Sequence, residues 1–208
     1  MNGVALVVIA KEPRPGLVKT RLSPPCTAAE AAALAEAALL DTLDVVTRTP
    51  ARRRVLVFDG DPERFRRDRL EIIPQRGEGL AQRLAAAFED VAAPALLVGM
   101  DTPQLTSRLL LDGMRALSAP TVDAVLGRAP DGGYWSIGMR QTGAPVFDGV
   151  PMSRTTTWLR QRTRLDELGL RVHDQPPLRD VDTIEDARAV ARTAPRSRFA
   201  AAVAAVDA

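Results

Sequence analysis

The segment "GVALVVIAKEPRPGLVKTRL", residues 3–22, joins a nearly continuous apolar run to a loop rich in proline and basic residues. An apolar run of this length that ends at turn-forming residues is typical of a strand buried on both faces of a sheet. The loop holds Lys11 and Lys19, the only lysines among the 28 basic residues of the chain. We therefore predict a central parallel strand whose carboxyl end opens into a basic loop.

Strand-like and helix-like segments alternate along the rest of the chain. Further strands are predicted at 54–59, 70–75, 95–101, 122–127, 134–139 and 170–174. Helices are predicted at 27–47, 78–90, 106–118, 155–168 and 183–193, the first opening with the capping pattern "TAAE". This alternation predicts an α/β domain with a mostly parallel sheet, spanning residues 1–193. The alanine-rich residues 194–208 are expected to form a C-terminal tail with a frayed or loosely docked terminal helix.

The composition is that of an ordinary soluble protein, with 46% hydrophobic and 26% charged residues. No apolar run reaches the roughly 18–20 residues of a membrane span. No charged segment precedes the first apolar run, so we expect a cytoplasmic protein without a signal peptide. Cys26 is the only cysteine, which excludes an internal disulfide and a cysteine metal cluster. A homodimer is the commonest assembly for such a chain and is the default expectation here.

The arginine clusters at 52–54 and 64–69 are compatible with a nucleic-acid surface or with ordinary solvated faces. Because 26 acidic residues nearly balance the 28 basic ones, the net charge is only +2. Nucleic-acid binding depends mainly on positive charge at phosphates, and few aromatic residues are available for stacking. Solvated faces are therefore the favoured interpretation, and nucleic acid is not expected as a partner.

Charged residues follow several of the predicted strands. Lys11 follows the first strand, Asp101 ends the segment 95–101, and Asp131 follows the strand at 122–127; Asp180 and Asp182 lie near the end of the domain. Ligands of open α/β sheets bind beyond the carboxyl ends of the strands. Carboxylates suit Mg²⁺, and basic side chains neutralise phosphate. The pattern thus predicts a site for a nucleotide with Mg²⁺ or Mn²⁺.

Each acidic residue also has a purely structural interpretation. Asp101 could cap the turn before Pro103, Asp131 could form an Asx-turn into Gly132, and Asp182 could help to cap the last helix. The joint placement of these residues at strand ends favours a functional role.

Other nucleotide-binding and catalytic motifs are missing from the sequence. It contains no G-x-x-x-x-G-K-[ST] pattern, and "GEG" at 77–79 does not complete a dinucleotide-binding motif. His173 is the only histidine, which leaves a histidine-based triad or zinc site without partners. The segment "PMSRTTTW", 151–158, either contacts phosphate or an acceptor, or forms a helix start with Ser153 or Thr155 as the cap.

Four motifs together resemble the DUF2064 family over about residues 4–192: "AKEPRPGLVKTRL", "GMDTPQL", "GRAPDGGYWSIGM" and "RDVDTIEDA". This family is similar to the glycosyltransferases and to the 2-phospholactate guanylyltransferases, which share the GT-A (nucleotide-diphospho-sugar transferase) fold. The resemblance implies a three-layer α/β/α sandwich around a mixed, mostly parallel sheet.

The resemblance also implies roles for individual residues. Lys11, Lys19 and Arg21, with Pro15 and Gly16, would belong to the loop that covers the nucleotide phosphates. The metal ligands would be Asp101 and Asp182. The acceptor side would consist of Asp131, Gly132, Gly133 and Tyr134. Gly132 and Gly133 would also contact the nucleotide.

The chain departs from the family pattern at three positions on the acceptor side. Arg128 stands where a proline is usual, Met152 where a tryptophan is frequent, and Arg154 interrupts a serine–threonine pair. The identity of the acceptor is therefore the property that the family resemblance predicts least.

Three functions are compatible with these residues. The first is a Mg²⁺-dependent nucleotidyltransferase that moves NMP from an NTP to a small phosphorylated acceptor, with Lys19 and Arg21 stabilising the pyrophosphate. The second is a glycosyltransferase with an NDP-sugar donor and Asp131 as a candidate base. The third is a non-catalytic protein that binds nucleotide or nucleic acid. The basic loop favours the first, because a triphosphate brings more charge than a nucleotide sugar.

Overall fold

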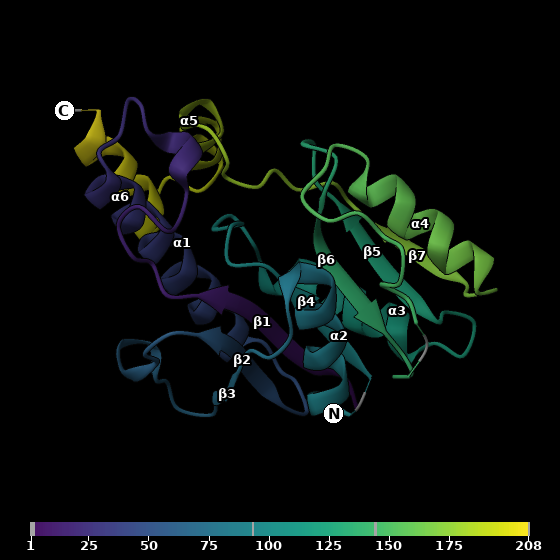
Figure 1. The fold of residues 1–208 in the computed structure, drawn as a ribbon. Coiled ribbons are helices and arrows are strands. Elements are labelled where there is room, and N and C mark those ends of the chain that lie inside the picture. Colours follow the sequence, from purple (N-terminus) through teal and green to yellow (C-terminus); the bar gives the residue numbers. More distant parts are fainter. Residues whose placement is uncertain (1–2, 93, 144, 208) are drawn as a thin grey trace.

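The computed structural model describes residues 3–92, 94–143 and 145–207, which fold around a seven-stranded sheet (Figure 1). The strands are β1 (Ala5–Lys11), β2 (Arg54–Asp59), β3 (Glu71–Pro74), β4 (Ala95–Val98), β5 (Ala124–Arg128), β6 (Tyr134–Met139) and β7 (Val172–Gln175). Their order in the sheet is β3-β2-β1-β4-β6-β5-β7. Every strand predicted from the sequence is present, with bounds that differ by a few residues at most.

One strand runs against the others. β6 pairs antiparallel with both β4 and β5, whereas the remaining neighbours pair in parallel. The predicted mixed, mostly parallel sheet is thus confirmed. Because β6 is reversed, its first residue, Tyr134, lies at the same edge as the carboxyl ends of the other strands.

Helices cover both faces of the sheet, which confirms the predicted three-layer sandwich (Figure 1). The helices are α1 (Ala28–Arg48), α2 (Gly79–Val91), α3 (Ser107–Ser118), α4 (Thr157–Glu167), α5 (Ile184–Thr193) and α6 (Arg198–Val206). α1 and α3 pack on one face, and α2 and α4 on the other. No helix in the described part of the chain is both long enough and apolar enough to cross a membrane.

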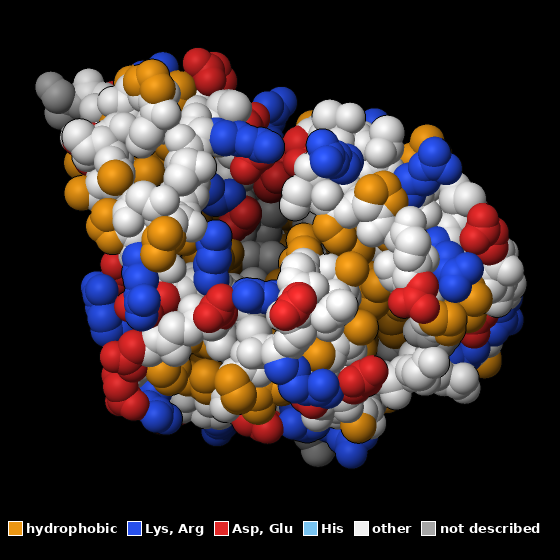
Figure 2. Space-filling model, viewed as in Figure 1, with side chains coloured by type: hydrophobic (Ala, Val, Ile, Leu, Met, Phe, Trp, Pro, Cys, Tyr) orange, Lys and Arg blue, Asp and Glu red, His pale blue; other side chains and the backbone are white. Residues whose placement is uncertain are grey.

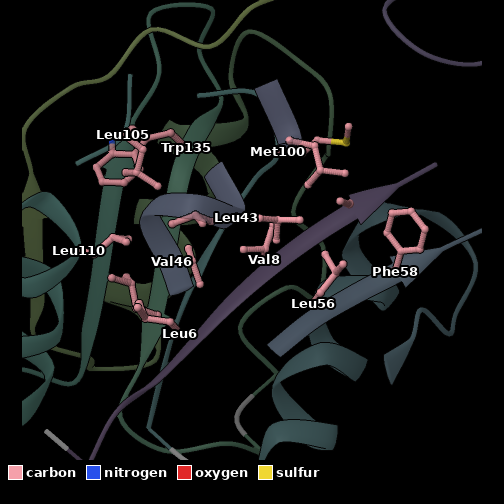
Figure 3. Close-up of a cluster of buried hydrophobic side chains, with 14 of the residues drawn as sticks. Leu6, Val8, Leu43, Val46, Leu56, Phe58, Met100, Leu105, Leu110 and Trp135 are labelled. Carbon is pink, nitrogen blue, oxygen red and sulfur yellow. The ribbon is translucent and has the colours of Figure 1, made fainter. Parts of the chain in front are cut away.

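The sequence of β1 explains how both faces are covered. Leu6 and Val8 point toward α1 and α3, while Ala5 and Val7 point toward α2. Successive side chains of a strand face opposite sides, so a continuous apolar run supplies two hydrophobic surfaces. Figure 3 shows the α1 side of this core, where Leu6 and Val8 lie beside Leu43.

Threonine caps define where three helices begin. The Thr27 side chain accepts a hydrogen bond from the backbone N–H of Glu30, whose carboxylate in turn accepts from the N–H of Thr27. Thr106 caps α3, and Thr183 forms a second reciprocal cap with Asp186. These caps satisfy backbone donors that have no partner within the helix. The helix starts predicted at these threonines are therefore confirmed.

The carboxyl-terminal helices α5 and α6 pack on α1, away from the sheet (Figure 1). Phe199 and Val203 of α6 are buried there, and the Asp41 carboxylate of α1 accepts a hydrogen bond from the backbone N–H of Phe199 at 2.9 Å. The predicted terminal helix is thus present over residues 198–206, but it is packed against α1 rather than frayed or loosely docked. The domain boundary at residue 193 stays a prediction.

Candidate functional site

A cleft of about 560 Å³ opens at the carboxyl edge of the sheet, between the loop after β1 and the start of α2. Figure 2 shows a hollow in this face of the molecule, with basic and acidic side chains together around it. Residues predicted for the site that line the cleft are Lys11, Lys19, Arg21, Asp101, Tyr134 and Asp182.

Two basic and two acidic side chains form a connected ion-pair network on the cleft wall. The Lys19 Nζ donates to Asp101 Oδ2 at 2.6 Å and lies 3.7 Å from Asp182 Oδ1. The Arg21 guanidinium donates to the other oxygen of Asp182, also at 2.6 Å. Lys19 is the enclosed member, with a side-chain exposure of 10%, whereas Arg21 is 70% exposed. The network joins residues that are 82 and 161 positions apart in the sequence.

The local sequence aims Lys19 into the cleft. Its backbone adopts the left-handed conformation (φ 48°, ψ 39°) just before a short 3₁₀ helix over Thr20–Leu22. Val18 and Leu22, on either side, are buried and anchor the loop in the protein. Lys11 braces the same loop, because its Nζ donates to the Leu17 carbonyl at 2.8 Å. The two lysines therefore have different tasks: Lys11 contacts backbone, and Lys19 contacts carboxylates.

The pKa of Lys19 reflects this setting. Burial by itself would lower the pKa, but the charge and hydrogen bond of Asp101, together with the charge of Asp182, outweigh it. The net effect raises the pKa above the ordinary value for lysine. Lys19 is thus a fixed positive charge at neutral pH.

A cluster of three carboxylates adjoins the network. Oxygens of Asp131, Asp180 and Asp182 all lie within 4.8 Å of one another. Val181, between two of these acids, is buried, and its N–H donates to the Asp101 carbonyl at 3.1 Å. In an extended segment, residues two apart point the same way, so Asp180 and Asp182 both face the cluster. Asp182 belongs to the cluster and to the ion-pair network at once.

Burial and the neighbouring charges of Asp131 and Asp182 raise the pKa of Asp180 to about 7. The unfolded chain ionises this carboxyl near its ordinary pKa of 3.8, so the folded state loses stability as the pH rises from about 4 to about 7 and does not regain it above.

Replacing Asp180 with asparagine is therefore expected to stabilise the metal-free protein at about pH 8, by roughly 1–3 kcal/mol, and to bring no gain at about pH 4. Urea titrations at the two pH values in EDTA measure the difference. Asp148→Asn, at an exposed acid outside the cluster, serves as the control. An equal gain at both pH values would show that ionisation of Asp180 is not the cause.

The turn at Asp131 combines both interpretations offered by the sequence. Asp131 Oδ1 accepts a hydrogen bond from the Gly133 N–H at 2.7 Å, which is the predicted Asx-turn, while its carboxylate also belongs to the acidic cluster. The neighbouring Gly132 has a φ of +92°, and a Cβ there would stand 1.9 Å from the Thr155 carbonyl oxygen.

We expect Gly132→Ala to lower the free energy of unfolding by roughly 2–4 kcal/mol, because the new methyl group collides with backbone and the φ is strained. Gly149 also has a positive φ (+75°) but open space around it. Gly149→Ala is thus the matched control, with an expected cost of about 1–2 kcal/mol. Chemical denaturation measures both, and equal costs would argue against the close contact at Gly132.

Several residues predicted for the site lie outside the cleft wall. Pro15, Gly16, Asp131, Gly132 and Gly133 are not among the described residues that line the cleft. The predicted nucleotide-binding role of these glycines and of Pro15, and the catalytic role of Asp131, stay predictions.

The hydroxyl-rich segment before α4 also contributes to the cleft. Ser153 lines it, with a left-handed backbone (φ 56°). α4 begins at Thr157 rather than at Thr155, because the Thr157 hydroxyl binds the Pro151 carbonyl and holds the preceding residues in a loop. The residue before the helix is Thr156, so neither Ser153 nor Thr155 is its N-cap.

Two further cleft residues were not selected from the sequence. The Arg83 guanidinium, on α2, donates to Asp59 Oδ2 at 2.7 Å and to Gln75 Oε1 at 3.1 Å. Gln75 in turn donates to the Ala10 carbonyl at 2.6 Å. Gln75 ends the strand predicted at 70–75, so the rule that ligands bind at strand ends could have found it. No comparable feature of the sequence pointed to Arg83.

The carboxylates fit a hard divalent cation. The donor set of Asp101, Asp131, Asp180 and Asp182 consists of oxygen ligands, which Mg²⁺ and Mn²⁺ prefer. Burial first, and then the charges of Asp131 and Asp182, raise the pKa of Asp180, so a nearby cation would favour its ionised form. Asp182 does not cap α5, because Thr183 does so, and the Asp182 carboxylate contacts Lys19 and Arg21 instead.

Comparison with known families gives one match. The model of DUF2064, described as "Uncharacterized protein conserved in bacteria", matches residues 42–154, more than half of the chain. The sequence matches no curated protein.

Solved structures resemble the chain over nearly its whole length. A proposed nucleotide-diphospho-sugar transferase from Desulfovibrio desulfuricans is 29% identical, with a TM-score of 0.88 and coverage of 100% of this chain and 96% of the other. A 4-diphosphocytidyl-2C-methyl-D-erythritol synthase from Anaerococcus prevotii has 12% identity, a TM-score of 0.58 and coverage of 93% and 97%. A Mycobacterium tuberculosis protein in complex with manganese has 19% identity, a TM-score of 0.53 and coverage of 90% and 97%. The chain therefore has the predicted nucleotide-diphospho-sugar transferase fold, and the last two likenesses concern the fold alone.

Proposed function

Since the chain belongs to the DUF2064 family and has the nucleotide-diphospho-sugar transferase fold, we propose that it is a divalent-metal-dependent nucleotidyltransferase. It would move NMP from an NTP to a small phosphorylated acceptor. The observation that carries this proposal is the network of Lys19 and Arg21 with Asp101 and Asp182 in the cleft. In that network, the side chains that would bind phosphate lie beside the carboxylates that would bind the metal.

The carboxylates of Asp101 and Asp182 would hold Mg²⁺ or Mn²⁺, with Asp131 and Asp180 beside them. The metal, when bound, supplies neutralisation of phosphate charge. Support for a manganese site comes from the Mycobacterium tuberculosis protein of the same fold, whose structure is a manganese complex.

In the proposed reaction, an oxygen of the acceptor phosphate forms a bond to the α-phosphorus of the NTP. The bond from that phosphorus to the α–β bridging oxygen breaks, and pyrophosphate leaves with the electron pair. Lys19 and Arg21 would stabilise the charge that develops on the pyrophosphate. For this, Lys19 and Arg21 would exchange their carboxylate partners for phosphate oxygens, while Asp101 and Asp182 would hold the metal.

A second candidate is a glycosyltransferase that uses an NDP-sugar. The Desulfovibrio desulfuricans protein, proposed as a nucleotide-diphospho-sugar transferase, favours it. In this case Asp131 would act as base or bind the acceptor. Nucleic-acid binding receives no support from the arginine clusters, where Arg53, Arg64 and Arg66 are paired with carboxylates.

The two enzymatic candidates differ in their products. Incubation with Mg²⁺, each NTP and a panel of phosphorylated acceptors should release pyrophosphate, measured with a coupled pyrophosphatase assay. Parallel incubations with UDP-, GDP- and ADP-sugars test for release of nucleoside diphosphate. Turnover of a nucleotide sugar without any pyrophosphate release would overturn the nucleotidyltransferase proposal.

A further inference from the structure

A second cavity, of about 510 Å³, lies between β5, β7 and the start of α4. Arg128, Pro130, Trp158, Asp174 and Pro177 are among its lining residues. None of its lining residues belongs to the cleft described above. The cavity is therefore a separate feature from that cleft.

Arg128 is the basic group of this cavity. Its guanidinium carbon lies 5.2 Å from the centroid of the Trp158 ring, within the range of a cation–π contact. Among the described residues, no carboxylate lies within ion-pair distance of Arg128 and no side-chain hydrogen bond forms. Arg162, by contrast, is paired with Asp174 at 2.5 Å. The N–H groups of Arg128 are thus available to an acceptor from outside the described chain.

Trp158 supplies a second unused donor. Its indole Nε1 is buried and has no hydrogen-bond partner among the described residues. A buried donor without a partner costs roughly 1–3 kcal/mol, and such groups in folded proteins usually have a reason. This indole nitrogen has no exposed surface, so the binding group of the cavity is the Arg128 guanidinium. Because the lining carboxylate of Asp174 is already paired to Arg162, the unpaired guanidinium favours a ligand that carries negative charge.

The cavity lies close to the proposed reaction centre. Arg128 precedes Asp131 by three residues, so their Cα atoms are at most about 11 Å apart. The Leu178 N–H donates to the Arg128 carbonyl at 3.1 Å, which brings the segment that leads to Asp180 alongside. The cavity and the acidic cluster are thus joined by short stretches of chain on both the β5 and the β7 side.

We propose that this cavity binds a distal oxyanion of the acceptor, a carboxylate or a second phosphate, through the guanidinium of Arg128, which lies over the Trp158 ring and makes that ring a reporter of binding. The attacking phosphate of the same molecule would lie at the acidic cluster. This inference rests on the proposed function and names its acceptor class: a phosphorylated small molecule with a second anionic group.

The two tryptophans allow a direct test without turnover. Each indole N–H gives one signal in a ¹H–¹⁵N NMR spectrum, and Trp158→Phe assigns them. Titration with inorganic phosphate, and separately with acetate, at constant ionic strength in chloride, should shift the Trp158 signal saturably. The anion that saturates the Trp158 signal at the lower concentration is the kind of oxyanion that the cavity prefers.

Arg128→Gln should weaken this response about tenfold or more, because the charge-assisted hydrogen bonds are lost. Arg160→Gln removes an exposed arginine of α4 that has no ion pair among the described residues, and should leave the response unchanged. A shift that does not saturate with either anion, or an equal response in Arg128→Gln, would overturn the proposal.

A further measurement separates this proposal from the proposed function. Arg128→Gln should leave binding of Mn²⁺-NTP unchanged in calorimetry while the oxyanion response is lost. If pyrophosphate release is absent in the wild type but the Trp158 response persists, the oxyanion site stands and the nucleotidyl reaction fails.

Discussion

Replacing Asp101 with asparagine is expected to lower metal-dependent turnover by roughly 1,000-fold, because a neutral amide cannot hold the divalent cation that offsets phosphate charge. The substitution preserves shape and removes only the charge. It also frees Lys19, whose nearest carboxylate is Asp101 at 2.6 Å. Steady-state pyrophosphate release and Mn²⁺ binding, followed by electron paramagnetic resonance, measure the two consequences.

The matched control for this variant is Asp148→Asn, which changes an exposed acid outside the cleft and should retain full activity. Thermal unfolding of both variants establishes that the fold is intact. If Asp101→Asn binds Mn²⁺ and nucleotide as tightly as the wild type, the metal assignment is wrong.

Replacing Lys19 with glutamine is expected to have two opposite effects. Turnover should fall by roughly 100-fold or more, since the leaving pyrophosphate loses a positive charge. Binding of Mn²⁺ alone should become roughly tenfold tighter, because Asp101 and Asp182 no longer carry a competing cation. A residue with only a structural role would not produce opposite changes in metal affinity and turnover.

The chain offers its own control for this experiment in the other lysine. Lys11→Gln removes a side chain that contacts the Leu17 carbonyl rather than carboxylates, so metal affinity should be unchanged. Lys19→Arg keeps the charge but places a planar fork in an enclosed position, and we expect it to lose most activity. Full activity of Lys19→Arg would mean that lysine is incidental at this position.

The fold was largely predictable because each element carries its own signal. The apolar run of β1 marks a strand buried on two faces, and the hydroxyls of Thr27, Thr106 and Thr183 mark helix starts. These signals depend on neighbouring residues alone. The start of α4 was misplaced because the Thr157 hydroxyl binds the carbonyl of Pro151 six positions earlier, a contact that the local pattern does not reveal.

The candidate site was less accessible to sequence reasoning. The rule that ligands bind at strand ends selected Asp101 and Asp182, but the carboxylate of Asp182 is shared between Lys19, Arg21 and the acidic cluster. Such sharing depends on how loops from different parts of the chain meet. The raised pKa of Asp180 likewise follows from its burial beside Asp131, which no sequence pattern indicates.

The ion-pair network also determines the electrostatic field that the cleft presents at long range. Lys19 and Arg21 cancel the charges of Asp101 and Asp182, so these four groups present almost no net field to the surrounding water. These four groups would then draw neither a free cation nor a bare triphosphate from solution by long-range attraction. The metal–nucleotide complex brings both signs of charge together and can replace every internal partner at once. The protein would thus discriminate against the metal alone and the nucleotide alone. Lys19 and Arg21 occupy the carboxylates in place of the metal, and Asp101 and Asp182 occupy the basic groups in place of the phosphates.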